Sequence, residues 1–503
     1  MQHEYDVVIV GSGNAALSAA LAARERVERV LVLEKAPQEW RGGNSYFTAG
    51  AFRLTFEHLD DLRPLLSDFT DEDAAEIDVS PYTKSHFLAD MQRITQGRCD
   101  PELTAVLVNE ATETAYWLGS KGLRWTLLST RQAFRVEGRL RFWGGLVVGT
   151  VGGGQGLVEQ QFAAVSARGI EVRYNTAVVD LLHHNGRSVS GVVCLRGQQR
   201  EEILAPSVIL ACGGFEADPR LRAMYLGPQW DLAKVRGTPY NTGDGLQMAL
   251  SLGAQAYGHW SGCHATAWDA AAPPTGDRVL TNLLTKQSYP LGIVVNNEAR
   301  RFVDEGADFR NYTYAKYGAE ILRQPNAIAY QLFDAKTEPL LRQDEYTAAG
   351  VSRFEAPTIQ TLAEKLSLNA AALERTVAEF NAAIQPGSFN PAIKDGKHTK
   401  GLSPAKSNWA LPLDTPPFYG FAVTCGITFT FGGLHVDTAG RVLDRDNHAI
   451  NGLYAAGELV GGLFYHNYPG GSGLMAGAVL GRRAGASAAS YAQTHSGITI
   501  NHP

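Results

Sequence analysis

Apolar runs and glycine-rich turns at the start of the chain predict alternating strands and a helix. Residues 5–10 form an apolar, β-branched run that is typical of a buried parallel strand. A helix is predicted over 15–24 and a second short strand over 30–33. These segments make up a β-α-β unit of roughly 30 residues, the building block of a doubly wound parallel sheet.

The rest of the chain alternates between helical and strand-like periodicity. Further helices are predicted over 85–98, 102–120, 156–168, 245–252, 362–366, 370–384 and 475–491. Strands and a hairpin are predicted within 169–210, and more strands over 421–423, 433–436 and 453–456.

A change in composition divides the chain. Aromatic and polar residues become frequent after residue 255 and remain so to about residue 408, and prolines follow from 412. We therefore expect 1–255 and 409–503 to form one dinucleotide-binding domain, and 256–408 to be a second domain inserted into it.

Composition excludes several classes of protein. The chain has 503 residues, 45% of them hydrophobic, which is ample for a large core, and its net charge of −6 argues against nucleic acid as a partner. No run of about 18 apolar residues predicts a membrane span, and no secretory signal precedes the first strand. We expect a cytoplasmic protein, with peripheral docking at the inner membrane left open.

Five scattered cysteines carry no redox or metal motif. None forms a C-x-x-C pair or a haem-attachment motif, so we expect buried thiols, no metal and no iron–sulfur cluster. A disulfide reductase is disfavoured for the same reason.

The first chemical motif is a G-x-G-x-x-A sequence from Gly11 to Ala16, between the first strand and the first helix. Gly11 permits the tight turn, Gly13 lets the backbone approach a pyrophosphate, and Ala16 allows close helix packing. The helix amino terminus then offers free N–H groups to the phosphates. Glu34 follows the second strand, where a carboxylate can accept a hydrogen bond from a ribose hydroxyl. These features predict a dinucleotide site.

Later glycine clusters favour FAD over NAD as the dinucleotide. They stand at Gly42-Gly43, Gly213-Gly214, Gly243, Gly457 and Gly471-Ser472-Gly473, and the last opens the final helix. That helix terminus is suited to stabilising a reduced, anionic flavin. No second G-x-G-x-x-G is present for a nicotinamide cofactor.

Over essentially its whole length the chain resembles the fumarate reductase/succinate dehydrogenase flavoprotein superfamily. Segments 259–264, 305–316, 427–434 and 467–474 resemble the FAD-dependent tricarballylate dehydrogenases, which oxidise a saturated tricarboxylate to an alkene. The resemblance implies an α/β fold in which a Rossmann-type FAD-binding domain of the GR2-like kind is interrupted by a smaller α+β capping domain. The candidate cofactor-binding residues are Gly11, Ser12, Gly13, Ala15, Ala16, Glu34, Lys35, Gly42, Gly43, Asn44, Ser45, Ala49, Gly50, Val178, Ala211, Gly213, Thr242, Asp244, Gly457, Glu458, Gly473 and Leu474.

The resemblance also implies catalytic residues and several departures from the family pattern. The active-site arginine of the superfamily falls on Arg310, one residue later than its usual spacing, and the substrate-binding histidine falls on His264. A second histidine and a second arginine of the family correspond to Phe429 and Tyr468. The position that carries covalent flavin in some members is Asn44, which favours non-covalent FAD.

Tyr468-Pro469-Gly470 resembles the 3-ketosteroid Δ1-dehydrogenases instead, in which a tyrosine polarises a ketone. The candidate catalytic residues are Arg310, Tyr468, His264 and Tyr312, and Tyr289 and Tyr314 are further candidates for the base. Arg310 could instead pair with Asp308 or Glu305 on a surface.

Two functions are compatible with these residues. The first is desaturation of a carbon–carbon bond next to a carboxylate, with a tricarballylate-like substrate favoured. The second is desaturation of a cyclic ketone or an oxo-ring carboxylate such as 4-oxocyclohexanecarboxylate. A non-catalytic flavin carrier is disfavoured. Either enzyme needs a separate electron acceptor, which could be a membrane electron-transfer protein, a quinone or oxygen.

Overall fold

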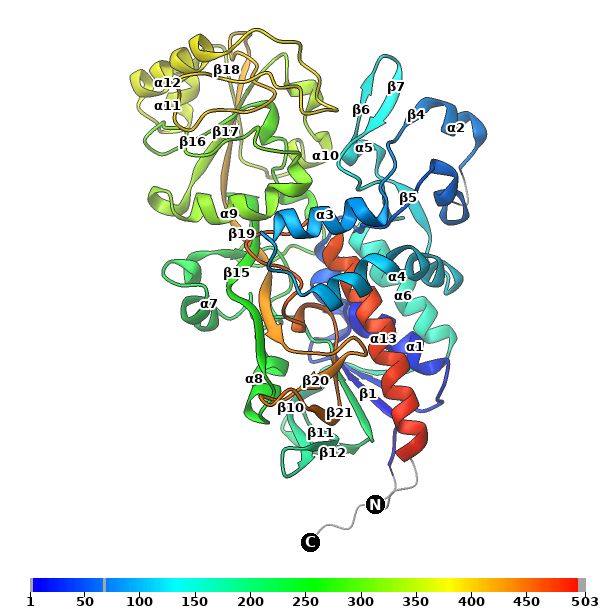
Figure 1. Cartoon of the computed structure of the whole chain (residues 1–503). Coiled ribbons are helices and arrows are strands. Elements are labelled where there is room, and N and C mark those ends of the chain that lie inside the picture. The colour runs from blue at the N-terminus through cyan, green and yellow to red at the C-terminus, as the bar shows by residue number, and fades with distance from the viewer. Residues whose placement is uncertain (1–2, 67–68, 496–503) are drawn as a thin grey trace.

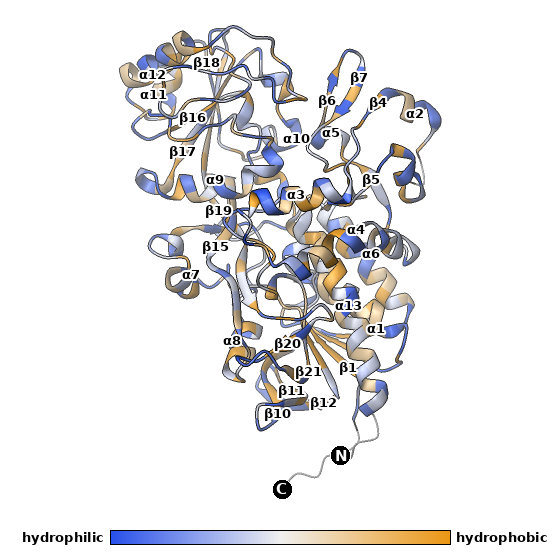
Figure 2. Ribbon diagram, in the orientation of Figure 1, coloured by the Kyte–Doolittle hydropathy of each residue, from blue (hydrophilic) through white to orange (hydrophobic). Residues whose placement is uncertain are grey.

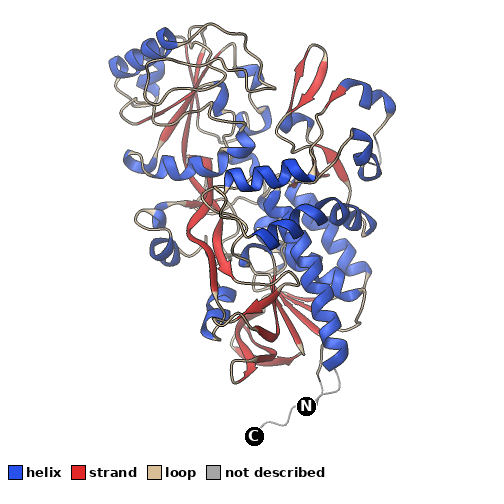
Figure 3. Ribbon diagram, in the orientation of Figure 1, coloured by secondary structure: helices blue, strands red, loops and turns tan. Residues whose placement is uncertain are grey.

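The protein contains two large β-sheets, and helices pack around both of them (Figure 1). The computed structural model describes residues 3–66 and 69–495. Figure 3 shows strands and helices interleaved throughout, as expected for an α/β protein.

The larger sheet has a parallel centre that contains the predicted β-α-β unit. From one edge its central strands are β9 (Glu171–Arg173), β2 (Val30–Leu33), β1 (Val7–Val10), β13 (Ser207–Leu210) and β21 (Ala449–Ala455). Every residue of β1, β2 and β13 is buried, because helices cover both faces of a parallel sheet. These strands are orange in the hydropathy view (Figure 2).

An antiparallel extension continues this sheet beyond β21. It consists of β10 (Ala177–His184), β11 (Ser188–Arg196) and β12 (Gln199–Leu204), while β20 (Arg441–Leu443) pairs with β21. The hairpins predicted within 169–210 are therefore confirmed.

The second sheet is organised around one long strand. Its members are β14 (Lys234–Val235), β15 (Ala256–Asp269), β16 (Ile293–Asn296), β17 (Ala329–Asp334), β18 (Arg353–Ala356) and β19 (Phe418–Leu434). All except β16 pair with β19. In Figure 1, β15 and β19 run lengthwise through the middle of the molecule.

The strand predicted over 421–423 is confirmed and that over 433–436 is confirmed for its first two residues, but both belong to the single strand β19, so the prediction of two separate strands is wrong. Two glycines of β19 lie where a tryptophan of β15 approaches the strand closely, and they do not interrupt it. A Cβ atom on Gly426 would lie 2.6 Å from Cβ of Trp268, and one on Gly432 would lie 2.6 Å from Cα of Trp260.

The predicted helices all occur, with ends that differ by a few residues, and others join them. The α-helices are α1 (Asn14–Arg24), α2 (Asp71–Glu76), α3 (Lys84–Ile94), α4 (Pro101–Ser120), α5 (Ser129–Gln132), α6 (Gly153–Ala167), α7 (Pro219–Tyr225), α8 (Asp244–Ser251), α9 (Tyr314–Leu322), α10 (Gln343–Tyr346), α11 (Ile359–Lys365), α12 (Ala370–Ala383) and α13 (Ser472–His495). None of these described helices is long and apolar enough to cross a membrane.

Small residues let the first and last of these helices pack closely (Figure 1). Gly477, Gly481 and Gly485 recur every fourth position, on one face of α13. A Cβ atom on Gly481 would lie 2.4 Å from the carbonyl oxygen of Ala15, and one on Gly485 would lie 2.2 Å from that of Ala19. The backbones of α1 and α13 therefore touch, which places both amino termini beside the same cavity.

Shorter elements complete the fold. Two small sheets contain β3 (Ala51–Phe52), β5 (Trp125–Leu127) and β8 (Val148–Thr150), and β4 (Ile77–Asp78), β6 (Ala133–Val136) and β7 (Arg139–Phe142). The second large sheet takes β14 and β19 from outside 256–408, and the division of the chain at 255/256 and 408/409 stays a prediction.

Candidate active site

One cavity opens at the carboxyl ends of the central parallel strands. Val10, Leu33 and Ala211, at or just after the ends of β1, β2 and β13, all line it. Open α/β sheets bind their ligands at this edge. The predicted cofactor-binding residues on its lining are Gly11, Ser12, Gly13, Ala15, Glu34, Lys35, Gly43, Asn44, Ser45, Ala49, Val178, Ala211, Gly213, Thr242, Asp244, Gly457, Glu458, Gly473 and Leu474.

Three predicted cofactor-binding residues lie behind this lining. Ala16 is fully buried, Gly42 donates its N–H to Ser12 Oγ at 3.2 Å, and the carbonyl of Gly50 accepts a hydrogen bond from the N–H of Thr150. They shape the wall without facing the cavity.

The turn after β1 fits a dinucleotide pyrophosphate. Gly11 has φ +103°, and a Cβ atom there would lie 2.4 Å from the carbonyl oxygen of Ala211. Gly13 caps α1 without any side-chain hydrogen bond, so its backbone leaves the helix amino terminus open to the cavity.

Two charged residues after β2 are held in place. Glu34 is buried and accepts hydrogen bonds from Ser12 Oγ at 2.6 Å and from the N–H of Ala36 at 2.7 Å. Burial raises the pKa of Glu34 against these hydrogen bonds. Lys35 Nζ lies 2.6 Å from both Thr242 Oγ1 and Asp244 Oδ2, which ties this segment to the start of α8.

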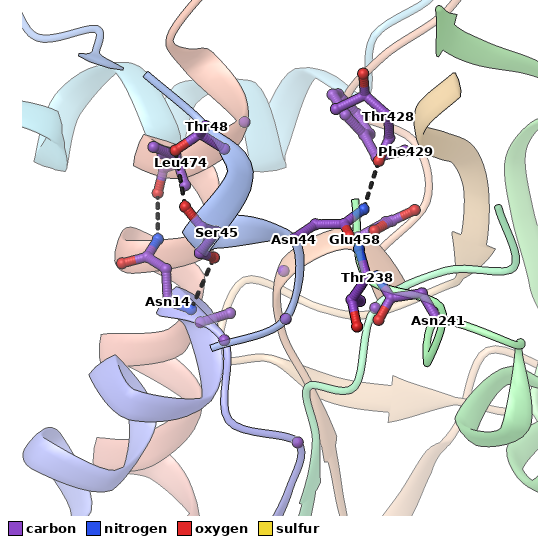
Figure 4. A pocket seen from close by; sticks show the side chains of 18 of the residues that line it. Asn14, Asn44, Ser45, Thr48, Thr238, Asn241, Thr428, Phe429, Glu458 and Leu474 are labelled. Carbon is purple, nitrogen blue, oxygen red and sulfur yellow. Dashed lines mark hydrogen bonds between the residues drawn. The ribbon is translucent and has the colours of Figure 1, made fainter. Parts of the chain in front are cut away.

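Three distant segments meet around Asn14, as Figure 4 shows. Its N–H donates to Ser45 Oγ at 3.0 Å, and its side-chain Nδ2 donates to the carbonyl of Leu474 at 2.7 Å. Thr48 Oγ1 in turn donates to the carbonyl of Ser45. The first turn of α1, the 43–48 segment and the start of α13 therefore form one wall of the cavity.

Asn44 lines the cavity with its amide fully used. Nδ2 donates to Glu216 Oε1 and to the carbonyl of Thr428, both at 2.6 Å, and Oδ1 accepts from the N–H of Thr238 at 2.8 Å (Figure 4). An amide is not a nucleophile, so this position offers no atom for a covalent link.

Two carboxyl groups lie together beside Asn44, that of Glu216 fully buried and that of Glu458 half-buried on the cavity lining. Glu458 Oε1 accepts a hydrogen bond from the N–H of Thr430 at 2.7 Å, and Glu216 Oε1 accepts from Asn241 Nδ2 at 2.6 Å. Burial first, and for Glu216 the neighbouring charge of Glu458, raise the pKa of both. Both carboxyl groups are therefore harder to ionise than a free glutamate. The sequence analysis missed Glu216, whose position just after Gly213-Gly214 at the end of a buried strand was the available signal.

Aromatic residues form another wall of the cavity. Tyr468 and Tyr314 both line the cavity, and their hydroxyl groups are hydrogen-bonded to each other. Burial raises the pKa of both phenols, that of Tyr468 well above its usual range, so both are neutral. Phe429 lies edge-on to Tyr468 with ring centres 5.2 Å apart.

His264 lies behind this wall and does not line the cavity. Its ring stacks on Phe429 at 5.3 Å and meets the edges of Tyr314 and Tyr468. Burial, and then the charge of Arg236, lowers the pKa of His264 well below its usual value. Among the described residues neither of its ring nitrogens has a hydrogen-bond partner.

Arg310 lines the cavity, and the alternative that it pairs with Asp308 or Glu305 is wrong. Asp308 pairs with Arg93 and Lys394, and Glu305 pairs with Arg301. Arg310 instead donates to the carbonyl of Arg131 and packs its guanidinium 4.7 Å from the ring centre of Trp143.

Tyr312, a predicted catalytic residue, does not line the cavity. Its hydroxyl group donates to Asp90 Oδ2 at 2.5 Å and lies 2.8 Å from the carbonyl oxygen of Gly144, outside the cavity lining. The structure instead brings Arg131, Arg236 and Arg342 to the lining. The sequence analysis missed these arginines, because no spacing or motif connects them.

Comparison with known proteins agrees with this site. A family model described as an FAD binding domain matches residues 6–474. The chain is 29% identical over 496 residues to a fumarate reductase (cytochrome) of Shewanella frigidimarina, covering 97% of this chain and 77% of that protein. It is 27% identical over 565 residues to a 3-oxosteroid 1-dehydrogenase of Mycobacterium tuberculosis, covering 94% and 96%. The solved open conformation of a flavocytochrome c3 fumarate reductase matches with a TM-score of 0.72 and 25% identity, over 97% of this chain and 78% of that one.

Proposed function

The chain belongs to the FAD-binding flavoprotein family that includes fumarate reductases and 3-oxosteroid dehydrogenases, and from that premise we propose that it desaturates a carbon–carbon bond next to a ketone. It is an FAD-dependent oxidoreductase that acts on CH–CH bonds. The ketone substrate is the part that goes beyond family membership.

The hydrogen-bonded pair of Tyr468 and Tyr314 carries this proposal. Both hydroxyl groups are buried on the cavity wall and remain protonated, so they can donate to a carbonyl oxygen as negative charge develops on it. At the two positions where the resemblance implies a second histidine and a second arginine for a carboxylate, this chain has Phe429 and Tyr468. The wall is therefore better matched to a neutral carbonyl.

The cavity suits FAD bound without a covalent link. We assign the pyrophosphate to the Gly11–Gly13 turn and the amino terminus of α1, and a ribose hydroxyl to Glu34. Asn44 supports non-covalent binding because its amide is not a nucleophile and is already fully hydrogen-bonded.

The chemistry follows from how the residues are arranged. Bound FAD supplies the acceptor for the hydride that leaves the β-carbon of the substrate. The α-carbon gives up its proton to a general base, for which the candidate is Arg310 on the cavity lining, because burial lowers the pKa of Arg310 well below its usual value. The developing enolate oxygen is stabilised by Tyr468, whose own hydroxyl is oriented by Tyr314. His264 acts from behind by fixing the ring positions of both tyrosines, through the edge-to-face contacts.

Anaerobic flavin bleaching tests the proposal. The purified protein is mixed with 4-oxocyclohexanecarboxylate, a 3-ketosteroid, tricarballylate or succinate, and flavin absorbance is followed. Bleaching by a ketone is expected. Bleaching by tricarballylate or succinate, but by neither of the two ketones, would rule out the ketone desaturase.

A tricarballylate-type dehydrogenase is the second candidate. The observation in its favour is that Arg131, Arg236, Arg310 and Arg342 line the same cavity. The same panel decides between the two candidates, because tricarballylate has no ketone for Tyr468 to polarise.

Turnover also needs an electron acceptor, which we propose is a separate partner. The five cysteines are free thiols, and the chain has no haem-attachment motif. A membrane electron-transfer protein, a quinone or oxygen would serve. Reoxidation rates with a soluble quinone and with oxygen would separate these acceptors.

A further inference from the structure

Arg53 is a charged side chain that lies fully buried behind the cavity wall. It follows β3 and does not itself line the cavity. In the part of the chain that the structure describes, its ion-pair partner is Asp90, whose Oδ2 lies 3.8 Å from Arg53 Nη1. That oxygen already accepts hydrogen bonds from the hydroxyl groups of Tyr82 and Tyr312. Burial of so weakly paired a charge is unfavourable, and the hydrogen bonds of Arg53 show what offsets it.

The main chain between Tyr468 and α13 is held by Arg53. Arg53 Nε donates to the carbonyl of Gly470 at 2.8 Å, and its backbone N–H donates to the carbonyl of Gly471 at 3.1 Å. The approach is close, because a Cβ atom on Gly471 would lie 3.0 Å from the backbone nitrogen of Arg53. Tyr468 precedes these two carbonyls, and Ser472, the first residue of α13, follows them. One residue therefore fixes the link between the tyrosine and the helix.

The guanidinium group also reaches the segment that carries Tyr314. Arg53 Nη1 donates to the carbonyl of Gly144 at 3.1 Å, and this carbonyl accepts a second hydrogen bond from Asn311 Nδ2 at 2.8 Å. The N–H of Gly470 in turn donates to the carbonyl of Asn311 at 2.7 Å. Asn311 lines the cavity shortly before Tyr314. Arg53 therefore ties together the two chain segments that supply the hydroxyl groups of the tyrosine pair.

Tyr312 belongs to the same hydrogen-bond network. Its carbonyl accepts from Asn467 Nδ2 at 2.6 Å, and Asn467 Oδ1 accepts from the N–H of Tyr468 at 2.9 Å. Its hydroxyl group accepts from Arg53 Nη1 at 3.4 Å. The backbone around Tyr468 is thus held by Asn467 before it and by Arg53 after it. Tyr312, which the sequence predicted to be catalytic, supports this backbone from outside the cavity.

The arginine keeps its charge in this position. Burial lowers the pKa of Arg53, but Tyr82, Tyr312 and Asp90 raise it, and the pKa ends above its ordinary value. Hydrogen bonds from a charged donor are stronger than those from a neutral one. The planar guanidinium group also presents its donors in a fixed fork, so it binds two carbonyls at once. A lysine carries the same charge on a single nitrogen and cannot reproduce that fork.

We propose that Arg53 is a positioning residue: it fixes residues 467–471, and through them the Tyr468 hydroxyl group and the start of α13. The part that concerns Tyr468 rests on the proposed ketone chemistry. The part that concerns α13 does not, because the first turn of that helix lines the cofactor cavity whatever the substrate. Misalignment is felt at the reacting atoms, so loss of a positioning residue lowers the rate more than the affinity for the substrate.

Arg53→Lys tests this role in the FAD-loaded protein by anaerobic stopped-flow absorbance. The substrate is 4-oxocyclohexanecarboxylate or the 3-ketosteroid, whichever bleaches the wild-type flavin. We expect the limiting rate of flavin reduction per bound FAD to fall about 10- to 100-fold, with the substrate dissociation constant within about twofold of the wild type. An unchanged limiting rate would overturn the role of Arg53 in positioning Tyr468.

A control and a second variant accompany this measurement. Arg301→Lys is the control and should keep the wild-type rate, because Arg301 is also largely buried but binds Glu305 and the carbonyl of Pro404, outside the cavity lining. If Arg53→Lys does not fold, Arg53→Gln, which keeps an amide donor without the charge, is measured with the same expectation.

A double-mutant cycle separates positioning from general destabilisation. If Arg53 acts through Tyr468, Arg53→Lys should lower the rate at most about fivefold further in a Tyr468→Phe background, the share that comes through the terminus of α13. A repeat of the full loss in that background would contradict the proposal, because Arg53 would then act independently of Tyr468.

The midpoint potential of the flavin tests the part that needs no substrate. It is measured by anaerobic dye equilibration for the wild type, Arg53→Lys and Arg301→Lys. We expect Arg53→Lys to weaken the binding of reduced relative to oxidised FAD roughly 2- to 5-fold, the contribution of a helix terminus, and so to lower the potential. If no ketone bleaches the flavin but the potential falls, the ketone desaturase fails and Arg53 keeps its role at α13. If a ketone bleaches both proteins at equal rates and the potential is unchanged, the ketone desaturase stands and the Arg53 proposal fails. An unchanged potential without bleaching by any ketone would overturn both.

Discussion

At the scale of single residues, the fold brings together side chains that lie far apart in the sequence. Tyr314 and Tyr468 are separated by 154 positions, yet their hydroxyl groups share a hydrogen bond. Arg131 and Glu345 are separated by 214 positions and form a buried ion pair. Because such pairings depend on the folded chain, local sequence could suggest Tyr468 and Arg310 but not their partners.

Tyr468→Phe tests the tyrosine pair. We expect the rate of flavin reduction by a ketone substrate to fall about 100- to 1000-fold, as when one hydrogen-bond donor to a developing oxyanion is removed. Stopped-flow absorbance gives this rate, and FAD content should be unchanged because the ring stays in place. An unaltered rate would contradict the role of Tyr468, and Tyr314→Phe serves as the comparison, with a smaller expected loss.

Glu345→Gln tests how far this carboxylate stabilises the neighbouring Arg131, Arg310 and Arg342. Removing the one buried anion leaves Arg131, Arg342 and Arg310 to repel each other, and we expect stability to fall by about 3–5 kcal/mol. The pKa of Glu345 is lowered, so the wild-type contribution is present above the ordinary glutamate pKa and is lost as pH falls towards about 2. Urea denaturation at pH 7 measures the loss, with the exposed Glu159→Gln as control. A loss of unfolding free energy no larger than that of the control would contradict the stabilising role of Glu345.

At the scale of elements, local patterns predicted more than long-range ones. β1, α1 and β2 were predicted almost to the residue, because an apolar run, a glycine turn and a helix are adjacent in sequence. The continuity of β19 was not predicted, since only the folded chain brings Trp260 and Trp268 against its glycines. α9, which carries Tyr314, was not predicted at all.

Gly481→Ala tests the contact between α1 and α13. The added methyl group would lie 2.4 Å from the carbonyl oxygen of Ala15, so the helices must separate. We expect a loss of about 1–3 kcal/mol, typical of overpacking, and weaker FAD binding because both helix termini face the cavity. Thermal melting and FAD titration measure the two effects. Ser490→Ala, at an exposed position of the same helix, should leave both unchanged; equal behaviour of the two variants would mean that the contact is not tight.

At the scale of the whole molecule, two neighbouring carboxyl groups lie where the two sheets adjoin. Glu216 follows β13 of the larger sheet, and Glu458 binds Thr430 of β19 in the second. The two carboxyl groups therefore meet where the two sheets adjoin. The sequence predicted the superfamily, the cofactor and the cavity edge, but the division of the chain into domains stays a prediction.

Glu216→Gln tests the raised pKa of Glu216 through the pH dependence of stability. The pKa of Glu216 is raised, chiefly by burial, so its contribution to stability is present below the ordinary glutamate pKa and is lost as pH rises through the raised value. We expect the melting temperature of the wild type to fall with rising pH, and the variant, which cannot ionise, to fall less. Melting curves from pH 5 to 9 provide the measurement. Parallel slopes for wild type, Glu216→Gln and the exposed control Glu364→Gln would exclude the pair as the cause.

The hydrogen bond from Asn14 to Leu474 spans 460 positions, and it has a consequence for how the protein is made. A ribosome that has completed the β-α-β unit has produced the phosphate-binding turn but not the wall that closes over it. That wall arrives only when the start of α13 has left the exit tunnel. The cofactor can therefore be captured firmly only after that point, and until then the growing chain must keep its apolar first helix from aggregating without help from FAD.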